Sequence, residues 1–149
     1  MLTRNEESSL LWKRVVDSFR KLYTGAQKNL VSKAGLSFAE YRILSILGEE
    51  TYSMSTFSAN LSMTQAAITG IVDKLETQGF VSRTRSDKDR RVVKIKMTLK
   101  GERALRKAER IHGEFTEQTL GSLDESELES LNLILQKLVK STSKLSIEK

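Results

Sequence analysis

The chain contains no cysteine and no proline, and only one histidine and one tryptophan among its 149 residues. The absence of cysteine excludes disulfides, thiolate zinc sites, cysteine nucleophiles and thiol redox sensing. The absence of proline favours long, uninterrupted helices. A dedicated zinc site needs several His, Cys or carboxylate ligands. We therefore predict that His112, the lone histidine, is a core or dimer-contact residue and not a metal ligand.

Long apolar runs are also missing. No run approaches the roughly 20 residues that a membrane-spanning helix needs, and the charged N-terminus lacks the apolar core of a signal peptide. We expect a cytoplasmic protein with no membrane partner. A chain of this length suits one domain with a substantial core. It has no phosphate-binding loop, nucleophile motif or dinucleotide fingerprint, so neither an enzyme nor a cofactor is predicted.

Positive charge is concentrated in one segment. Residues 82–100 contain eight basic and two acidic side chains, a formal net charge of +6 that equals the charge of the whole chain. A polar tip is followed by alternating residues from Val92 to Met97, which is typical of a β-hairpin. A basic hairpin suits a polyanionic partner. The Asp87-x-Asp89 pair lacks the glycine and glutamate of a calcium loop.

Apolar residues elsewhere recur every three or four positions and predict six helices. The first carries Leu11 to Leu30 on one face and ends near Gly35; the others are expected after Ser37, from Met54, after Thr64, after Thr98 and after Asp124. Ser37 and Glu40 form a predicted capping box. The helix after Thr64 is expected to turn Ala67, Ile68, Ile71, Val72 and Leu75 inward.

This order predicts a mainly α fold with a small two-stranded β-hairpin. Its middle, residues 37–98, is a winged helix–turn–helix and the expected DNA-binding region. The outer helices, residues 1–36 and 99–149, have apolar stripes too long to be explained by covering that small domain. Because two-fold homodimers are the commonest oligomers, we assign these helices to dimerisation within a single chain unit.

Several segments in register resemble the MarR family of transcriptional regulators. They are Phe57-Ser58-Ala59-Asn60-Leu61, Ser62-Met63-Thr64, residues 67–81, the wing signature Asp87-Lys88-Asp89-Arg90-Arg91, and Leu99-Lys100-Gly101 behind Thr98. The resemblance implies a homodimer that binds double-stranded DNA at a pseudo-palindromic operator. The alternative is a winged-helix module that binds another protein, but such a module needs an apolar or acidic surface where this chain has bases.

The second helix of a helix–turn–helix enters the major groove with its N-terminal residues facing base edges. The predicted DNA-contacting residues of this helix are Thr64, Gln65, Ala66, Thr69 and Lys74. Gln65 can form paired hydrogen bonds to adenine, and Ala66 can meet a thymine methyl group. The alternatives are that Thr64 is only an N-cap and that Gln65 and Thr69 lie on a solvated face.

The wing is predicted to bind DNA through Arg83, Arg85, Lys88, Asp89, Arg90, Arg91, Lys94 and Lys96. A narrow minor groove attracts arginine, and the resemblance implies one inserted arginine, here Arg91, held by Asp89. The basic residues of the two strands are expected to contact phosphates, which position a protein without reading sequence. The alternative is a solvated turn with local ion pairs worth roughly 0–1 kcal/mol each.

The resemblance also implies a small aromatic-acid or phenolic effector, bound between the dimer helices and the winged domain. The residues expected to line such a pocket are Arg20, Tyr23, Phe38, Tyr41 and Arg42. The alternative is that the three aromatic residues belong to the core and that the two arginines are ordinary surface residues.

Overall fold

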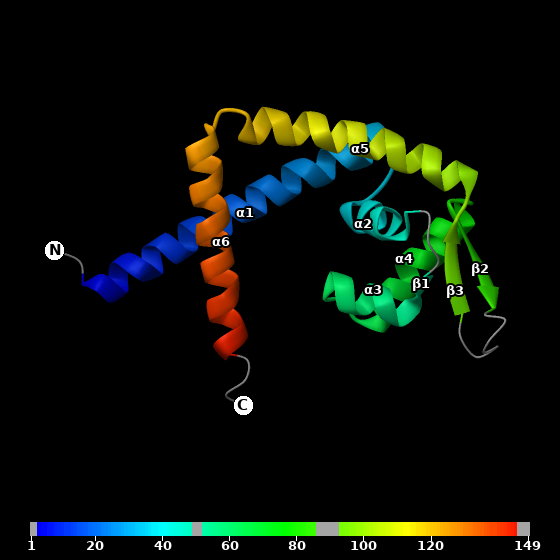
Figure 1. Ribbon diagram of the computed structural model, residues 1–149, viewed down its shortest axis with the longest axis horizontal. Coiled ribbons are helices and arrows are strands. Elements are labelled where there is room, and N and C mark those ends of the chain that lie inside the picture. Colours follow the sequence, from blue (N-terminus) through cyan, green and yellow to red (C-terminus); the bar gives the residue numbers. More distant parts are fainter. Residues whose placement is uncertain (1–2, 49–51, 86–92, 146–149) are drawn as a thin grey trace. The chain divides into compact units, whose positions relative to one another are not determined.

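The computed structural model describes residues 3–48, 52–85 and 93–145 (Figure 1). Its elements are α1 (Arg4–Ala34), α2 (Phe38–Leu47), β1 (Tyr52–Ser53), α3 (Met54–Leu61), α4 (Gln65–Thr77), β2 (Val81–Arg85), β3 (Val93–Met97), α5 (Leu99–Leu120) and α6 (Glu125–Leu145). The mainly α fold with a wing is as predicted. The chain divides into two compact units, Met1–His112 and Gly113–Lys149, and each is described by itself.

The predicted caps begin and end the helices. Ser37, Thr64 and Asp124 precede α2, α4 and α6, and Gly35, with φ of 74°, ends α1 in the left-handed conformation that glycine tolerates. At α2 the N–H of Glu40 donates to Oγ of Ser37 over 3.2 Å, and the N–H of Ser37 donates to Oε2 of Glu40 over 2.5 Å. This reciprocal pair is the predicted capping box.

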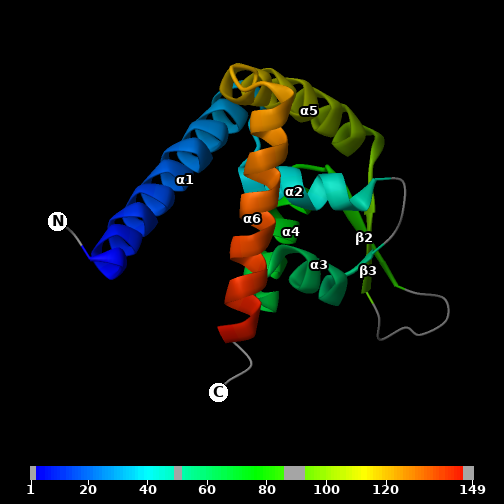
Figure 2. The same cartoon turned by 60° about the vertical axis from the view of Figure 1, so that its left-hand side comes forward.

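The sheet has one strand more than predicted. Its order is β1-β3-β2 and all neighbours are antiparallel. Figure 2 shows the two strands of the wing, β2 and β3, side by side. The hairpin strands pair in register from Val81 with Met97 to Arg85 with Val93. The additional strand β1 pairs with the other edge of β3 through Tyr52 and Ser53. Two residues are too few to show a period of two, so β1 left no pattern in the sequence.

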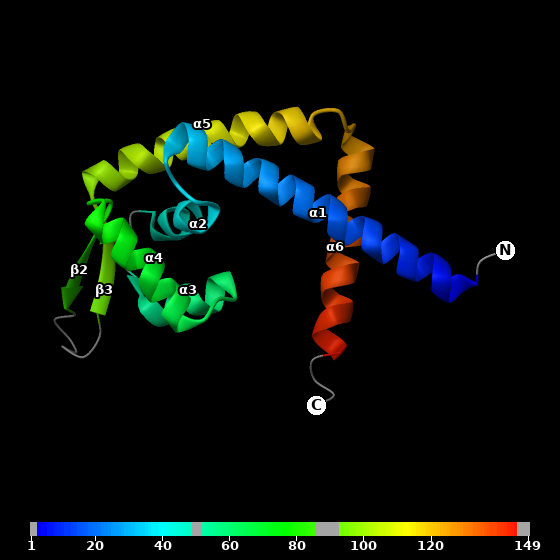
Figure 3. The same ribbon diagram turned by 180° about the vertical axis from the view of Figure 1, so that it is seen from behind.

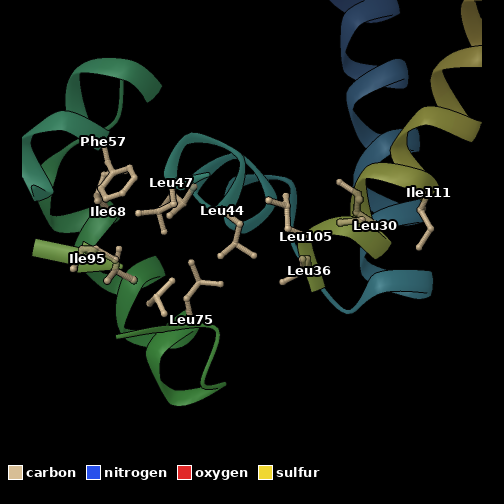
Figure 4. Close-up of a cluster of buried hydrophobic side chains, with 14 residues drawn as sticks. Leu30, Leu36, Leu44, Leu47, Phe57, Ile68, Leu75, Ile95, Leu105 and Ile111 are labelled. Atoms are coloured by element: carbon tan, nitrogen blue, oxygen red, sulfur yellow. The ribbon is translucent and has the colours of Figure 1, made fainter. Parts of the chain in front are cut away.

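One buried apolar core joins the winged helix to parts of the flanking helices (Figure 4). Phe57, Ile68 and Ile95 are fully buried in the winged helix. Leu30 at the C-terminal end of α1 and Leu105 in the first half of α5 belong to the same cluster. These ends of α1 and α5 therefore help to hold the winged helix together.

The prediction for α4 was wrong at one position. Ile68, Val72 and Leu75 are buried and Ile71 is half-buried, but Ala67 is exposed. Ala67 precedes Ile68 by one residue, about 100° around the helix, which turns it away from the core. Figure 3 shows α3 and α4, the two helices of the helix–turn–helix, beside each other.

Large apolar side chains stay exposed along most of α1. Leu11 is 62% exposed, Phe19 52% and Leu22 45%. Within the second unit, Leu128, Leu131 and Leu138 of α6 are likewise exposed. Most apolar residues of α6 and of α1 before Ala26 are thus exposed, whereas Leu105, Ala108 and Ile111 of α5 are buried in the core. None of the helices in the described ranges combines the length and hydropathy needed to span a bilayer.

Candidate nucleic-acid interface

The start of α4 presents a polar, nearly uncharged face to solvent. Thr64, Gln65, Ala66 and Thr69 are all exposed at the N-terminal end of this helix. Oγ1 of Thr64 accepts a hydrogen bond from the N–H of Ala67 over 3.3 Å, so Thr64 caps the helix. Capping uses one acceptor site of the hydroxyl and leaves its proton for another partner.

Thr69 and Gly70 continue this face. The Thr69 hydroxyl donates to the Gln65 carbonyl over 2.8 Å, which fixes its rotamer and leaves its lone pairs outward. Gly70 is exposed, and a Cβ built on it would meet no atom within 4 Å. Glycine costs about 1 kcal/mol against alanine inside a helix. The fold therefore does not require glycine here, and its effect is to leave bare backbone on the exposed face.

Arg83 joins the wing to α4. Its guanidinium contacts the carboxylate of Asp73 and lies 2.6 Å from Oε2 of Glu76, and its backbone N–H donates to Oε1 of Glu76 over 3.2 Å. Partial burial of the guanidinium opposes its charge, but the two carboxylates outweigh this and raise the pKa of Arg83. Asp73 is exposed on α4, so this pairing neutralises an acid that would repel phosphate.

Among the described residues, the other basic side chains of the wing strands have no ion pair like those of Arg83. Arg85 and Lys96 are exposed, Lys94 is half-buried, and no carboxylate among the described residues forms an ion pair with any of them. Lys94 pairs with Thr84 and Lys96 with Ser82, so the two lysines share one face of the hairpin. The predicted tip residues Lys88, Asp89, Arg90 and Arg91 lie outside the described residues.

Lys74 also has a partner within the fold. Its Nζ lies 2.8 Å from Oε1 of Glu40, a residue of α2 that is only 1% exposed. Burial of the Glu40 carboxyl favours the neutral acid, but the Lys74 ammonium and hydrogen bonds with Ser37 outweigh burial and lower the pKa of Glu40. The sequence pattern identified Glu40 as a cap and missed this ion pair.

Lys100, another base of the charged segment, is held at the base of the wing. Its Nζ donates to the carbonyl of Gln78 over 2.7 Å and lies 5.4 Å from the centroid of the Phe80 ring. Thr98 lies beside it: its hydroxyl donates to the Gly79 carbonyl over 2.7 Å, and its N–H donates to the Phe80 carbonyl over 3.0 Å. Part of the charge in residues 82–100 thus stabilises the fold.

Known proteins share this arrangement. The model of the MarR family matches residues 36–93. The HTH-type transcriptional regulator BilQ of Clostridium symbiosum is 31% identical over 123 residues, covering 82% of this chain and 85% of BilQ. The chain belongs to the MarR family. It is a DNA-binding transcriptional regulator and not an enzyme.

Solved structures of transcriptional regulators have the same fold. A MarR family transcriptional regulator from Streptomyces coelicolor, in complex with DNA, is 23% identical with a TM-score of 0.83, covering 95% of this chain and 90% of that one. An organohalide-sensing regulator in its 2,4-dichlorophenol-bound form is 23% identical with a TM-score of 0.81, covering 96% and 85%. The chain therefore shares its fold with these two structures.

In this MarR chain, three of the five predicted effector residues come together with His112. The ring centroids of Tyr23 and Phe38 lie 5.3 Å apart, and the ring of His112 lies 5.6 Å from Phe38 and 5.2 Å from Tyr41. This aromatic cluster joins α1, α2 and α5. Nδ1 of His112 is buried without a hydrogen-bond partner among the described residues. Sequence periodicity placed His112 near an apolar face but did not show that it belongs to this cluster.

The two predicted arginines of that pocket lie in solvent. Arg20 is paired with Asp17 over 3.6 Å, with both side chains mostly exposed, and Arg42 is exposed. The ligand-binding roles of Arg20 and Arg42, like the roles of the other predicted contact residues, stay predictions.

The substitution Gly70→Ala tests the effect of this residue on stability and on DNA affinity separately. We expect Gly70→Ala to raise stability by about 1 kcal/mol, or about 3 °C in melting temperature, because helix propensity improves and no atom obstructs the methyl group. If this face of α4 contacts DNA, we expect the affinity for DNA to fall about tenfold, or about 1.4 kcal/mol, because the methyl group would lie between helix and DNA. Thermal melting and DNA titration measure the two effects. An unchanged affinity for DNA would show that Gly70 does not lie in the DNA interface.

Proposed function

We propose that this MarR regulator binds a pseudo-palindromic operator as a homodimer, with α4 in the major groove and the wing at the adjacent minor groove. The observation that carries the proposal is the exposed polar start of α4 beside a basic hairpin. Gln65 and Ala66 are exposed at the position from which a recognition helix reads base edges. Thr64 and Thr69 flank them with hydroxyl groups suited to bases or phosphates.

The wing supplies affinity in this proposal. Arg85, Lys94 and Lys96 contact phosphates, which contribute sequence-independent binding energy. Arg91 enters the minor groove and Asp89 orients it. Arg83 supports them from within the fold, by holding the first wing strand against α4.

The uncovered faces of the outer helices support the homodimer. An exposed apolar surface of the extent seen on α1 marks an interface, and Leu11, Phe19 and Leu22 lie on it. A two-fold axis would set the recognition helices of two copies about one DNA turn, ~34–36 Å, apart. We keep the assignment of residues 1–36 and 99–149 to dimerisation, with Leu30 and Leu105 serving the core of the winged helix as well.

We also propose that a phenolic or small aromatic-acid effector binds beside the aromatic cluster. Tyr23, Phe38 and Tyr41 offer ring faces, and Arg20 or Arg42 offers a cation for a carboxylate. The support is the contact between these rings and the dichlorophenol found in a protein of the same fold. Such a ligand would change DNA binding only by binding two states of the protein with different affinity.

DNA titration tests the proposed site. We expect labelled DNA from this gene's own upstream region, carrying an inverted repeat, to bind with an affinity that falls ~10³–10⁵-fold between about 50 and 200 mM salt if about 6–10 phosphates are contacted. Arg91→Ala should weaken binding, whereas Arg103→Ala, at an exposed position of α5, should not. Salt-insensitive binding, or binding to a protein but not to DNA, would contradict the proposal.

A further inference from the structure

Glu40 has two roles at the first turn of α2. One carboxylate oxygen, Oε2, accepts from the N–H of Ser37 and closes the capping box. The other, Oε1, lies 2.8 Å from Nζ of Lys74 on the recognition helix. The Glu40 side chain is 2% exposed, whereas that of Lys74 is 59% exposed. A buried carboxylate of α2 therefore contacts the helix proposed to read DNA.

The cap alone does not require this charge. Glutamine occupies the third position of capping boxes as well as glutamate, because a neutral carbonyl oxygen can accept the same hydrogen bond. Burying an ion costs several kcal/mol unless a counter-charge is well placed. Lys74 is the one basic residue that forms an ion pair with Glu40 among the described residues. The cap hydrogen bonds also favour the carboxylate, but Lys74 supplies the counter-charge that its burial requires.

We propose that Lys74 is a positioning residue, whose ion pair with Glu40 fixes the orientation of α4 against α2, and that it does not contact phosphate. Lys74 follows the half-buried Ile71 by three residues, and it lies about 140° around the helix from Thr69 and about 180° from Gln65, two residues proposed to contact DNA. Its ammonium is directed to the neighbouring helix. The inference refines the proposed DNA site and rests on it.

The same turn of α2 is also fixed to α1. The N–H of Phe38 donates to Oε1 of Gln27 over 2.8 Å, and Phe38 is the ring shared by most contacts of the aromatic cluster. Phe38, which donates this hydrogen bond to Gln27, and Glu40, which forms the ion pair with Lys74, lie in the same helical turn. The Glu40–Lys74 ion pair therefore links the first turn of α2, which also carries Phe38 of the aromatic cluster, to the recognition helix.

Salt dependence separates positioning from phosphate contact. We would measure binding of operator DNA and of random-sequence DNA at several salt concentrations for the full-length protein and for Lys74→Met, Glu40→Gln and the double variant. Lys96→Met is the matched control, since Lys96 is an exposed lysine proposed to contact phosphate. Losing a phosphate contact reduces the slope of log affinity against log salt by about one.

For a positioning pair, Lys74→Met and Glu40→Gln should each weaken operator binding about tenfold and leave binding of random DNA and the salt slope unchanged. The double variant should lose no more than the weaker-binding single variant, because the two residues act through one contact. Lys96→Met should weaken binding of both DNAs and reduce the slope.

The inference is overturned if Lys74→Met reduces the slope as Lys96→Met does while Glu40→Gln binds like the wild type. It is equally overturned if both single variants bind operator DNA normally. Circular dichroism and thermal melting would establish that each variant is folded. The Lys74→Met variant leaves Glu40 buried without a counter-charge and could unfold for that reason. In that case the same test is made with Glu40→Gln and the double variant, which lack the buried charge. Failure of the wild type to bind either DNA would instead refute the proposed site.

Discussion

Gly101→Ala is expected to destabilise the protein more than any other single change considered. A Cβ at this position would lie 2.0 Å from the carbonyl oxygen of Phe80 and 2.8 Å from Cγ of Met97. The oxygen belongs to backbone that is itself fixed by the N–H of Thr98, so it cannot move aside cheaply. We expect a loss of about 3 kcal/mol and a fall in melting temperature of about 10 °C, measurable by calorimetry.

Gly113→Ala provides the control within the same helix. A Cβ at Gly113 would meet no atom within 4 Å, so the variant should gain up to about 1 kcal/mol from better helix propensity. The two substitutions are chemically identical and differ only in their surroundings. If Gly101→Ala were as stable as Gly113→Ala, the close approach of α5 to the start of the wing would be wrong.

The second large effect is expected at Phe19. If the exposed face of α1 is buried in a homodimer, Phe19→Glu places a charge in an apolar interface and should dissociate it. The mass measured by light scattering should fall from that of two chains to that of one. Operator affinity should fall by about 100-fold or more, because each half-site then binds alone.

Thr24→Glu is the matched control for charge. Thr24 is exposed on the opposite side of α1 from Phe19, close to Arg20 and Lys28 one turn away on either side. It should leave both the mass and the operator affinity unchanged. A Phe19→Glu protein that remained dimeric and bound DNA normally would exclude this face of α1 as the interface. If the wild type were already monomeric, the homodimer itself would be refuted.

Local features of the fold were predictable from the sequence. Ser37 and Thr64 were correctly predicted as caps because a cap acts on the N–H groups of its own first turn. The end of α1 at Gly35 followed from the tolerance of glycine for positive φ. The inward face of α4 followed from its period, with Ala67 as an error at the edge of the stripe.

Contacts between distant segments were not predictable in the same way. The ion pair of Glu40 with Lys74 and the place of His112 in the aromatic cluster depend on how helices pack, and no local pattern specifies them. Arg83 did leave a signal. Val81 is buried and strand residues two apart share a face, so Arg83 could have been assigned to the side of the hairpin that meets α4.

The short strand β1 has a consequence for how the wing holds its lysines. Because β1 and β2 pair with opposite edges of β3, β3 is the central strand of the sheet and β2 is an edge strand. Lys94 pairs with Ser53 on one side and Thr84 on the other, so its backbone is restrained from both directions. In the proposed DNA complex we therefore expect Lys94 to hold a more constant position than Arg85, which lies at the end of the edge strand.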